Sequence, residues 1–395
     1  MNKIDLIAFS EYKTGGVQTF YKHLLSYDTD FFNKKWILTK RESDTDPLPT
    51  SEILELPHDV LSIREGSAYR NARALKKLIP NYHSDGLILV NQPSELRFLS
   101  AIPPKNKTIF FFCHDEVYLD FAKRYESIID VFIAHNIAFY SALKSMFPER
   151  TNNIFFLPFG IEKPKKYSNE KKEEVNKLTV IFLARLVKLK GVFDIPDIDD
   201  ILISKGIDVN WKIIGNGPEK EKLKKQVDKR SNFMFCSPEY KKDLDRELAE
   251  GDIFVLPTYL DGTPLALLES MSVGLVPIVY EFNEGASHMI GEGNGFVVPV
   301  GDKEAIANSI ITLNNNRSFL SKKSLSVRKH ISENFDRQSR NKKYYELFSD
   351  YKKHWRRKKV NVKIYKSRLE RLWLPYPIIQ VLTYLKNLLY YLANK

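Results

Sequence analysis

The stretch "DIFVLPTYLDGTPLALLESMSVGLVPIVY", residues 252–280, places two short apolar runs on either side of an apolar segment of helical length. The runs at 252–257 and 275–280 predict buried strands, and the segment between them predicts a helix. Thr263 is predicted to be the N-cap of that helix and Pro264 its first residue. A strand, a helix and a second strand in this order are typical of parallel α/β sheets.

The same alternation continues on both sides of this stretch. Short apolar runs, separated by segments of helical length, predict further strands at 3–9, 85–91, 107–113, 130–135, 153–158, 178–184 and 209–215. They are too many for one sheet, and residues 163–177 form a polar, charged segment without apolar periodicity. We therefore expect an α/β protein with two Rossmann-like, doubly wound domains, 1–162 and 178–335, joined by this linker and facing a cleft.

Length and composition favour a globular protein with two domains of ordinary size. The chain has 395 residues, of which 43% are apolar and 28% are charged. The N-terminus lacks the basic region and apolar core of a secretion signal, and Cys113 and Cys236 lie far apart in the sequence. Two such cysteines are typical of reduced core residues, so we expect a cytoplasmic protein.

The net charge of +12 is concentrated near the C-terminus. Residues 352–395 contain twelve Lys or Arg and one acid, Glu370, which leaves a net charge of +1 for residues 1–351. Nucleic-acid-binding proteins usually carry such charge on a folded binding face, and no base-stacking module accompanies it here. The charge distribution therefore argues against a nucleic-acid partner.

The apolar residues after Pro377 follow helical spacing. They are Ile378, Val381, Leu382, Leu385, Leu388, Leu389 and Leu392. The segment is shorter than the ~20 residues that span a bilayer, and it includes Lys386. With the basic residues before it, it predicts an amphipathic tail at 356–395 that lies on the inner face of an anionic membrane. A helix that packs on the protein body or on a partner is the alternative.

Three glycine-containing or basic loops follow predicted strands, at the sheet edge where α/β proteins bind ligands. Gly15 and Gly16 precede a predicted helix and allow an anion to approach closely, although a tight turn would need them equally. Arg185 and Lys190, in "ARLVKLKG", suit the oxygens of a diphosphate. A solvated basic loop is the alternative for this second pair.

The third loop, "GNGP", follows the strand predicted at 209–215. Gly215 and Gly217 suit a backbone turn pressed against a nucleotide, and Pro218 is predicted to open the next helix. The third glycine of a dinucleotide-binding fingerprint is missing, so the spacing argues against NAD.

Glu269 lies inside the apolar helix predicted after Pro264. A buried carboxylate needs a hydrogen-bonding or charged partner. The hydroxyls of a ribose suit it, as they suit acids in other nucleotide sites, and a buried Lys is the alternative partner. The free N–H groups at the start of the same helix suit a phosphate. A second acid, Asp261, stands eight positions before Glu269.

Six motifs occur in order along residues 1–350: "GGVQTF", "FCHDE", "ARLVKLKG", "GNGP", "DGTPLALLESMSVGLVPIV" and "GEGNGFVVPVGDKEAI". In this order they resemble the retaining glycosyltransferases of glycosyltransferase family 4, which have the GT-B fold. The signature of that family is two glutamates separated by seven residues, and this chain has Asp261 and Glu269. The resemblance also implies that a helix at 336–355 crosses back to the first domain.

The resemblance implies a role for each matching residue. In such enzymes the second acid, here Glu269, holds the donor ribose, the Arg and Lys neutralise the diphosphate, and the loop His contacts the transferred sugar. The first acid, here Asp261, lies near sugar hydroxyls. The implied donor-binding residues are Gly16, Arg185, Lys190, Gly215, Gly217, Gly262, Thr263, Pro264, Leu265 and Glu269. The implied catalytic residues are His114, Arg185, Lys190 and Asp261, and the implied acceptor-binding residues are Gly15 and Gly16.

The resemblance implies a retaining transferase that moves a sugar from a UDP- or GDP-linked donor to a hydroxyl of a membrane-proximal acceptor. A lipid-linked saccharide or a glycolipid, in surface polysaccharide biosynthesis, is the expected acceptor. Because Arg185, Lys190 and a helix start can stabilise the leaving diphosphate, we expect no metal and no cofactor. The motif "DIPDIDD", residues 194–200, resembles a DxD metal motif but is expected on a surface helix.

Two alternatives stay open at this point. Another enzyme of the same fold, a sugar-nucleotide epimerase or a phosphorylase, would share these motifs. Asp261 is one methylene shorter than the usual Glu, and a displacement on the order of 1 Å can cost ~100-fold in rate. A non-catalytic, membrane-bound nucleotide-sugar-binding protein is therefore the second alternative.

Overall fold

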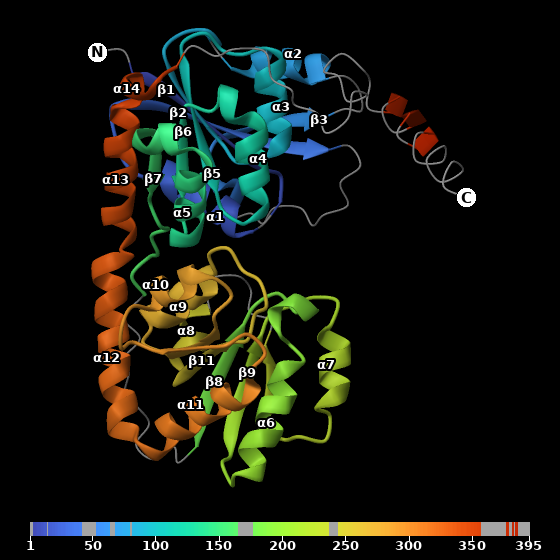
Figure 1. The fold of residues 1–395 in the computed structure, drawn as a ribbon, viewed down its shortest axis with the longest axis vertical. Helices are drawn as coiled ribbons and strands as arrows, with labels where there is room; N and C mark the ends of the chain where they lie inside the picture. The colour runs from blue at the N-terminus through green and yellow to red at the C-terminus, as the bar shows by residue number, and fades with distance from the viewer. Residues whose placement is uncertain are drawn as a thin grey trace. The chain divides into compact units, whose positions relative to one another are not determined.

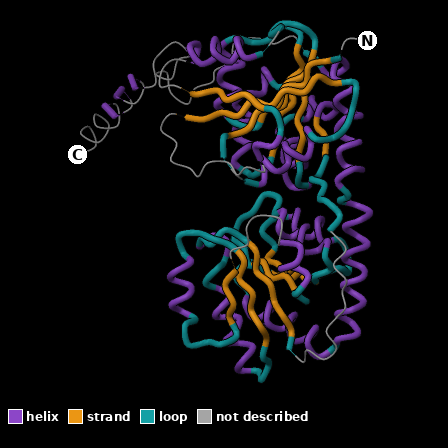
Figure 2. Tube along the Cα trace, turned by 180° about the vertical axis from the view of Figure 1, so that it is seen from behind, coloured by secondary structure: helices purple, strands orange, loops and turns teal. Residues whose placement is uncertain are grey.

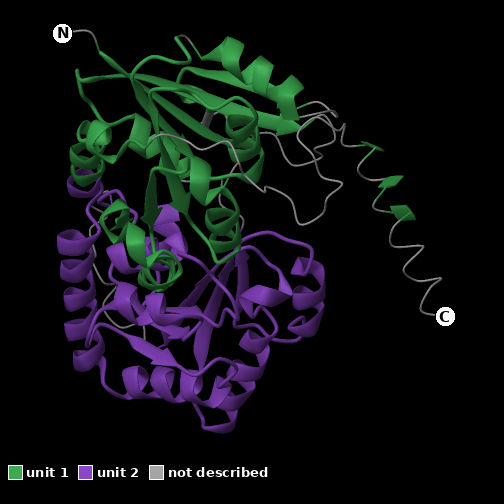
Figure 3. Cartoon of the chain, turned by 45° about the horizontal axis from the view of Figure 1, so that its top comes forward, with its two compact units in different colours: residues 1–158, 341–395 green, residues 159–340 purple. Residues whose placement is uncertain are grey.

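The structure, a computed structural model, describes residues 3–13, 15–41, 53–63, 68–79, 81–164, 177–236 and 244–356, and six residues of the tail (377–378, 381–382 and 384–385). The chain divides into two compact units, coloured in Figure 3. Unit 1 comprises residues 1–158 and 341–395, and unit 2 comprises residues 159–340.

The described residues of unit 1 form a seven-stranded sheet with the order β3-β2-β1-β4-β5-β6-β7 (Figure 1). Each neighbouring pair is parallel. The strands are β1 Ile4–Glu11, β2 Phe32–Arg41, β3 His58–Ile63, β4 Gly86–Val90, β5 Lys107–Cys113, β6 Val131–Ala134 and β7 Ile154–Phe156. Parallel neighbours need crossover connections, and α-helices supply them in this unit except between β2 and β3, where the described residues form the 3₁₀ turn η1, Ile53–Glu55.

The helices of unit 1 lie on both faces of its sheet (Figure 2). They are α1 Gly16–Leu25, α2 Ala68–Leu78, α3 Pro93–Ala101, α4 Val117–Tyr125 and α5 Ile137–Met146, with the 3₁₀ turns η1 Ile53–Glu55, η2 Glu126–Ile128 and η3 Pro148–Asn153. Near the end of the chain come α13 Arg337–Ser349 and α14 Tyr351–His354, which are separated at Asp350. The described part of the segment 336–355 is thus two helices rather than one.

The described residues of unit 2 form a six-stranded parallel sheet with the order β10-β9-β8-β11-β12-β13. The strands are β8 Leu178–Leu183, β9 Val209–Ile214, β10 Phe233–Cys236, β11 Ile253–Leu256, β12 Val276–Tyr280 and β13 Phe296–Val298. The helices are α6 Asp194–Ser204, α7 Lys220–Gln226, α8 Leu244–Ala249, α9 Leu265–Ser272, α10 Glu284–Ile290, α11 Lys303–Asn315 and α12 Arg317–Asn334, with the 3₁₀ turn η4 Lys188–Lys190.

Both sheets reverse their direction of winding beside the first strand of the unit. In unit 1 the chain goes outward from β1 to β3 and then returns to place β4 on the other side of β1. In unit 2 it goes from β8 to β10 and then places β11 beside β8. Ligands of such doubly wound sheets bind at this reversal, beyond the carboxyl ends of the strands.

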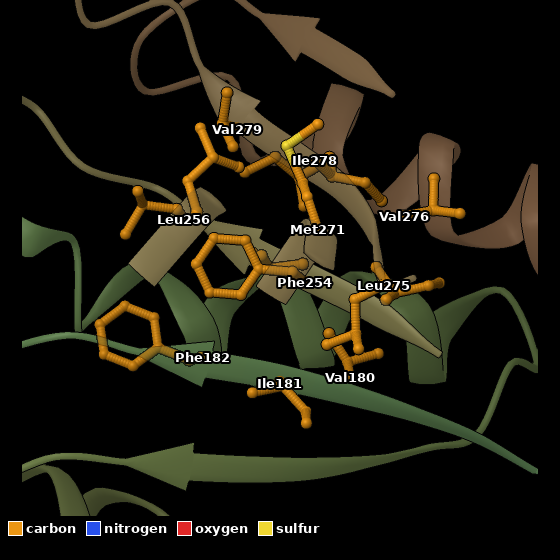
Figure 4. Packing of buried hydrophobic residues seen from close by; sticks show 14 of the residues in the cluster. Val180, Ile181, Phe182, Phe254, Leu256, Met271, Leu275, Val276, Ile278 and Val279 are labelled. Atoms are coloured by element: carbon orange, nitrogen blue, oxygen red, sulfur yellow. The ribbon is translucent and has the colours of Figure 1, made fainter. Parts of the chain in front are cut away.

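The core of unit 2 explains why its central strands read as unbroken apolar runs. Every residue of β11 and β12 is buried, because helices cover both faces of the sheet. Figure 4 shows Met271 of α9 in the same cluster as Phe254 of β11 and Ile278 of β12. Each such side chain contributes about 1.5–3 kcal/mol when it leaves water. This packing holds α9, and the loop before it, on the sheet.

The nine strands expected from apolar runs are all present, and the expectation of two parallel α/β domains is confirmed. The predicted first residues of two helices were wrong. The helix after "DGTP" begins at Leu265, with Pro264 at the N-cap, so Thr263 does not cap it. The helix after "GNGP" begins at Lys220, because the backbone from Gly217 first makes a turn through Pro218.

Parts of two other predictions lie outside the described residues. Residues 165–176 of the expected linker are among them, as is most of the expected tail at 356–395. Within the described ranges, no helix has both the length and the apolar character needed to cross a bilayer.

Candidate functional site

The strongest candidate site lies in unit 2, where the chain leaves β8 and β11. Gly191 follows β8 with a φ of 68°, and a Cβ there would lie 1.9 Å from the carbonyl oxygen of Pro257, so only glycine fits. Two hydrogen bonds join the same loops: the Thr258 hydroxyl and the Tyr259 amide both donate to the Leu189 carbonyl, at 3.2 and 3.0 Å. The loops after β8 and β11 therefore form one continuous surface.

Lys190 and Asp261 meet across these two loops. Lys190 Nζ lies 2.5 Å from Asp261 Oδ2, with the two side chains 21% and 16% exposed. Lys190 Nζ also donates to the Leu260 carbonyl at 3.3 Å, and Asp261 Oδ1 accepts from the Gly262 amide at 2.9 Å. Sequence reasoning placed both residues at the site but did not find their ion pair, because 71 positions separate them.

The glycine turn after β9 packs against the backbone of the loop that carries Arg185. A Cβ at Gly215 would lie 2.0 Å from the Ala184 carbonyl oxygen, and a Cβ at Gly217 would lie 2.4 Å from that of Leu186. These glycines thus allow two loops to touch, and the expected contact of their backbone with a nucleotide stays a prediction. Arg185 itself is exposed beside them.

The candidate site also includes the start of α9, which follows the loop after β11. The Thr263 hydroxyl oxygen is buried and has no hydrogen-bond partner among the described residues. Asn283 Nδ2 donates to the carbonyl of Asp261 at 2.9 Å, while Asn283 Oδ1 caps α10 at the Gly285 amide. Glu269 is half-buried one turn after Leu265. The site thus combines two cations, a helix N-terminus and two carboxylates.

A hydrogen-bond network around the buried Asp194, which sequence reasoning missed, supports the loop after β11. Asp194 Oδ2 accepts hydrogen bonds from the hydroxyls of Tyr259 and Tyr280, at 2.8 and 2.9 Å. Lys303 Nζ lies 3.6 Å from Asp194 Oδ1. Burial, and then the charge of Asp194, raise the pKa of Tyr280. The network fixes the position of Tyr259, two residues before Asp261.

The acidic run 194–200 makes structural ion pairs. Asp199 is buried and accepts from the indole of Trp211 and from Arg230, both at 2.8 Å. Asp197 pairs with Lys303 at 2.5 Å. Within the described part of the chain, no group of three or more His, Cys, Asp and Glu side chains could hold a metal ion.

In unit 1, His114 follows β5 and is buried among aromatic rings. Its ring stacks on that of His135 with 4.6 Å between the centroids, and on that of Phe112. Burial, and then the charge of His135, lower the pKa of His114 well below its ordinary value, so the ring is neutral at pH 7. Asn91, which follows β4, places Nδ2 3.4 Å from His114 Nε2.

A fully buried acid, Glu95, fixes the turn that carries Asn91. Glu95 Oε2 accepts from the amides of Asn91 and Gln92, at 3.2 and 3.1 Å, as the acid of a capping box on α3. The side-chain Nε2 of Gln92 donates to the Tyr118 hydroxyl at 3.0 Å, and the Tyr118 ring lies edge-on to His114. Burial raises the pKa of Glu95 to about 8. The sequence signal for this cluster is the acid three residues after Gln92.

The glycine pair after β1 begins α1. Gly15 is the N-cap in extended conformation, and a Cβ there would lie 2.9 Å from Gln18 Oε1. Gln18 Nε2 donates to the Glu11 carbonyl at 3.1 Å, which closes the loop between β1 and α1. Gly16, the first helical residue, is exposed. The anion-binding role expected for this glycine pair stays a prediction.

Comparisons with known proteins agree with this architecture. The family described as "Glycosyl transferases group 1" matches residues 164–335. The amylovoran biosynthesis glycosyltransferase AmsK of Erwinia amylovora is 28% identical over 188 residues, which are 45% of this chain and 46% of that protein. The Escherichia coli UDP-Gal:alpha-D-GlcNAc-diphosphoundecaprenol alpha-1,3-galactosyltransferase is 29% identical over 140 residues, covering 35% and 36% of the two chains.

A solved structure shows the same fold over most of the chain. HepE from Anabaena, crystallised in complex with UDP, superposes with a TM-score of 0.72 at 16% identity, covering 88% of this chain and 100% of that one. The chain spans about half the length of the first curated relatives it matches. The matched segment includes the loops of Arg185, Lys190 and Asp261 and the helix of Glu269. Residues 164–335, which make up most of unit 2, are therefore similar to the group 1 glycosyltransferases, and the two parallel-sheet units have the GT-B fold.

Proposed function

We propose that the protein is a retaining glycosyltransferase that uses a nucleotide-diphosphate sugar, UDP- or GDP-linked, as donor. The observation that carries the proposal is that Arg185, the Lys190–Asp261 pair and the start of α9 all lie in the segments that follow β8 and β11, the two strands at the reversal. Two cations and a helix N-terminus on one face suit the charges of a diphosphate. Glu269, one turn into α9, holds the ribose hydroxyls in this proposal, and Asp261 faces those of the sugar.

The charges at this face also suit the chemistry of transfer. When the bond between the sugar and the phosphate oxygen breaks, negative charge grows on the diphosphate and the sugar becomes oxocarbenium-like. Arg185, Lys190 and the α9 amides stabilise that charge in place, so the reaction needs no metal ion. His114, neutral because it is buried, contacts the transferred sugar as a hydrogen-bonding group rather than as a cation.

We further propose a membrane-proximal acceptor, a lipid-linked saccharide or a glycolipid, in surface polysaccharide biosynthesis. The Escherichia coli relative is named for transfer to a diphosphoundecaprenol-linked sugar, and AmsK is named for amylovoran biosynthesis. In the tail, Ile378, Val381 and Leu385 are helical and exposed, at spacings that put them on one face. Exposed apolar residues after a basic stretch suit the inner face of an anionic membrane, which makes the protein a peripheral membrane enzyme of the cytoplasm.

The decisive experiment measures release of nucleoside diphosphate from a panel of UDP- and GDP-sugars. We expect slow release from one donor by the intact protein and a loss of at least ~100-fold in Glu269→Ala. Glu221→Ala, an exposed acid on α7, is the matched control and should keep the wild-type rate.

Other outcomes separate the alternatives. Isomerised sugar nucleotide without an acceptor would identify an epimerase, and dependence on inorganic phosphate would identify a phosphorylase. Donor binding without turnover across a range of acceptors would identify a binding protein. Failure of every donor to bind would overturn the proposed function.

A further inference from the structure

The pairing of Lys190 with Asp261 places the cation proposed for the diphosphate in direct contact with an acid. Both side chains are mostly shielded from solvent, since 21% of the Lys190 side chain and 16% of the Asp261 side chain are exposed. A phosphate that binds Lys190 must therefore share it with a carboxylate or displace that carboxylate.

The surrounding contacts hold Asp261 in place. Its Oδ1 accepts from the Gly262 amide at 2.9 Å, and its carbonyl accepts from Asn283 Nδ2 at 2.9 Å. On the other side, the contact of Gly191 with Pro257 fixes the backbone next to Lys190. The carboxylate cannot swing away from a ligand without losing its bond from the Gly262 amide, and Asn283 holds the backbone that carries it, so its charge stays beside the bound phosphates.

We propose that Asp261 makes the site discriminate between the glycosylated donor and the bare nucleoside diphosphate. This inference rests on the proposed function. A glycosylated donor offers sugar hydroxyls that replace Lys190 as partners of the Asp261 carboxylate. A bare nucleoside diphosphate offers none, and it leaves the carboxylate facing phosphate.

Charge strengthens the discrimination. The terminal phosphate of a bare nucleoside diphosphate resembles a phosphomonoester, with a second ionisation at a pKa of about 6, so it carries extra negative charge at pH 7. The phosphate that is esterified to the sugar keeps one charge. Asp261 therefore repels the nucleoside diphosphate product more than it repels the glycosylated donor. It speeds release of the product and weakens binding of the donor less.

The test is calorimetric titration of UDP and of GDP into the full-length protein and its variants. Asp261→Asn keeps the shape and one acceptor oxygen while removing the charge, and it should bind the recognised nucleotide about 10-fold more tightly than the wild type. Asp261→Glu keeps the charge and should bind it no more tightly than the wild type. Lys190→Met should bind it more weakly, because the phosphate loses its cation.

Asp208→Asn is the matched control. Asp208 also pairs with a lysine, Lys177, at 2.7 Å in the same unit, but it directly precedes β9, whereas the candidate site follows the carboxyl ends of β8 and β11. Its nucleotide affinity should equal that of the wild type. Thermal unfolding of each variant, without nucleotide, checks that the fold is kept.

The outcomes separate this inference from the proposed function. A wild type that binds UDP or GDP, with an Asp261→Asn variant that binds it equally or more weakly, overturns the inference and leaves the transferase proposal standing. A wild type and variants that bind neither nucleotide and no nucleotide sugar overturn both. Tighter binding in Asp261→Asn alone, together with stronger product inhibition of its donor turnover, supports the inference.

Discussion

Glu95 shows how one buried residue can dominate the pH dependence of stability. Its carboxyl group is fully buried, and burial outweighs the two amide hydrogen bonds that favour its charged form. The folded pKa is about 8, whereas the ordinary value is 4.5. The folded state therefore holds a proton that the unfolded state has lost between these two pH values. Stability falls as pH rises through that window and is level above it.

We predict that Glu95→Gln removes this dependence. The difference in the free energy of unfolding, variant minus wild type, should rise between pH 5 and pH 8, by up to about 1.4 kcal/mol per pH unit. Urea unfolding at several pH values measures it. Glu116→Gln, at an exposed acid before α4, should show a constant difference. A flat difference for Glu95→Gln would contradict the assignment of a raised pKa.

At the scale of secondary-structure elements, the loops after β8 and β11 depend on one left-handed glycine. We predict that Gly191→Ala lowers the free energy of unfolding by about 2–4 kcal/mol, because the new Cβ meets the Pro257 carbonyl oxygen and forces the two loops apart. The same change should weaken nucleotide binding, since Lys190 and Asp261 lie on these loops.

Gly206→Ala is a close control for this substitution. Gly206 has nearly the same φ, 70°, but its Cβ would meet nothing within 4 Å. The control should lose only about 1–2 kcal/mol, the cost of the left-handed conformation, and should bind nucleotide as the wild type does. Equal losses in urea unfolding for the two variants would show that the contact with Pro257 is unimportant.

The sequence predicts the buried central strands better than the strands at the sheet edges. It does not predict which distant residues contact each other. The central strands β4, β5, β11 and β12 are buried on both faces and appear as plain apolar runs. The strands β2, β3, β10 and β13 are not among the nine expected runs, because charged residues, exposed positions or a length of three or four residues hide their pattern. Contacts such as Lys190–Asp261 and Asn91–His114 depend on which strands are neighbours, and strand order is not visible in residue periodicity.

At the scale of the whole molecule, the described contacts show where the tail can be removed cleanly. Arg356 donates its amide to Asp130 at 3.0 Å, and Tyr351 accepts from the Thr108 hydroxyl through its carbonyl oxygen. A chain that ends at residue 356 therefore keeps the contacts of α14 with unit 1. It removes the exposed apolar residues Val381 and Leu385.

We predict that this truncated chain keeps donor turnover but no longer sediments with vesicles of phosphatidylcholine and phosphatidylglycerol. The full chain with Val381→Ser and Leu385→Ser should bind these vesicles more weakly, and vesicles of phosphatidylcholine alone should bind every form weakly. If the truncated chain sediments as well as the full chain, the membrane role of the tail is wrong.

The division of the chain between the units has a consequence for synthesis on the ribosome. Unit 2 is one continuous segment, but unit 1 is built from both ends of the described chain. Tyr344, Tyr345, Phe348 and Tyr351 are buried in unit 1 although they are translated after all of unit 2. The first unit to emerge is thus the last to be completed, and until α13 and α14 arrive its apolar surface stays exposed to chaperones.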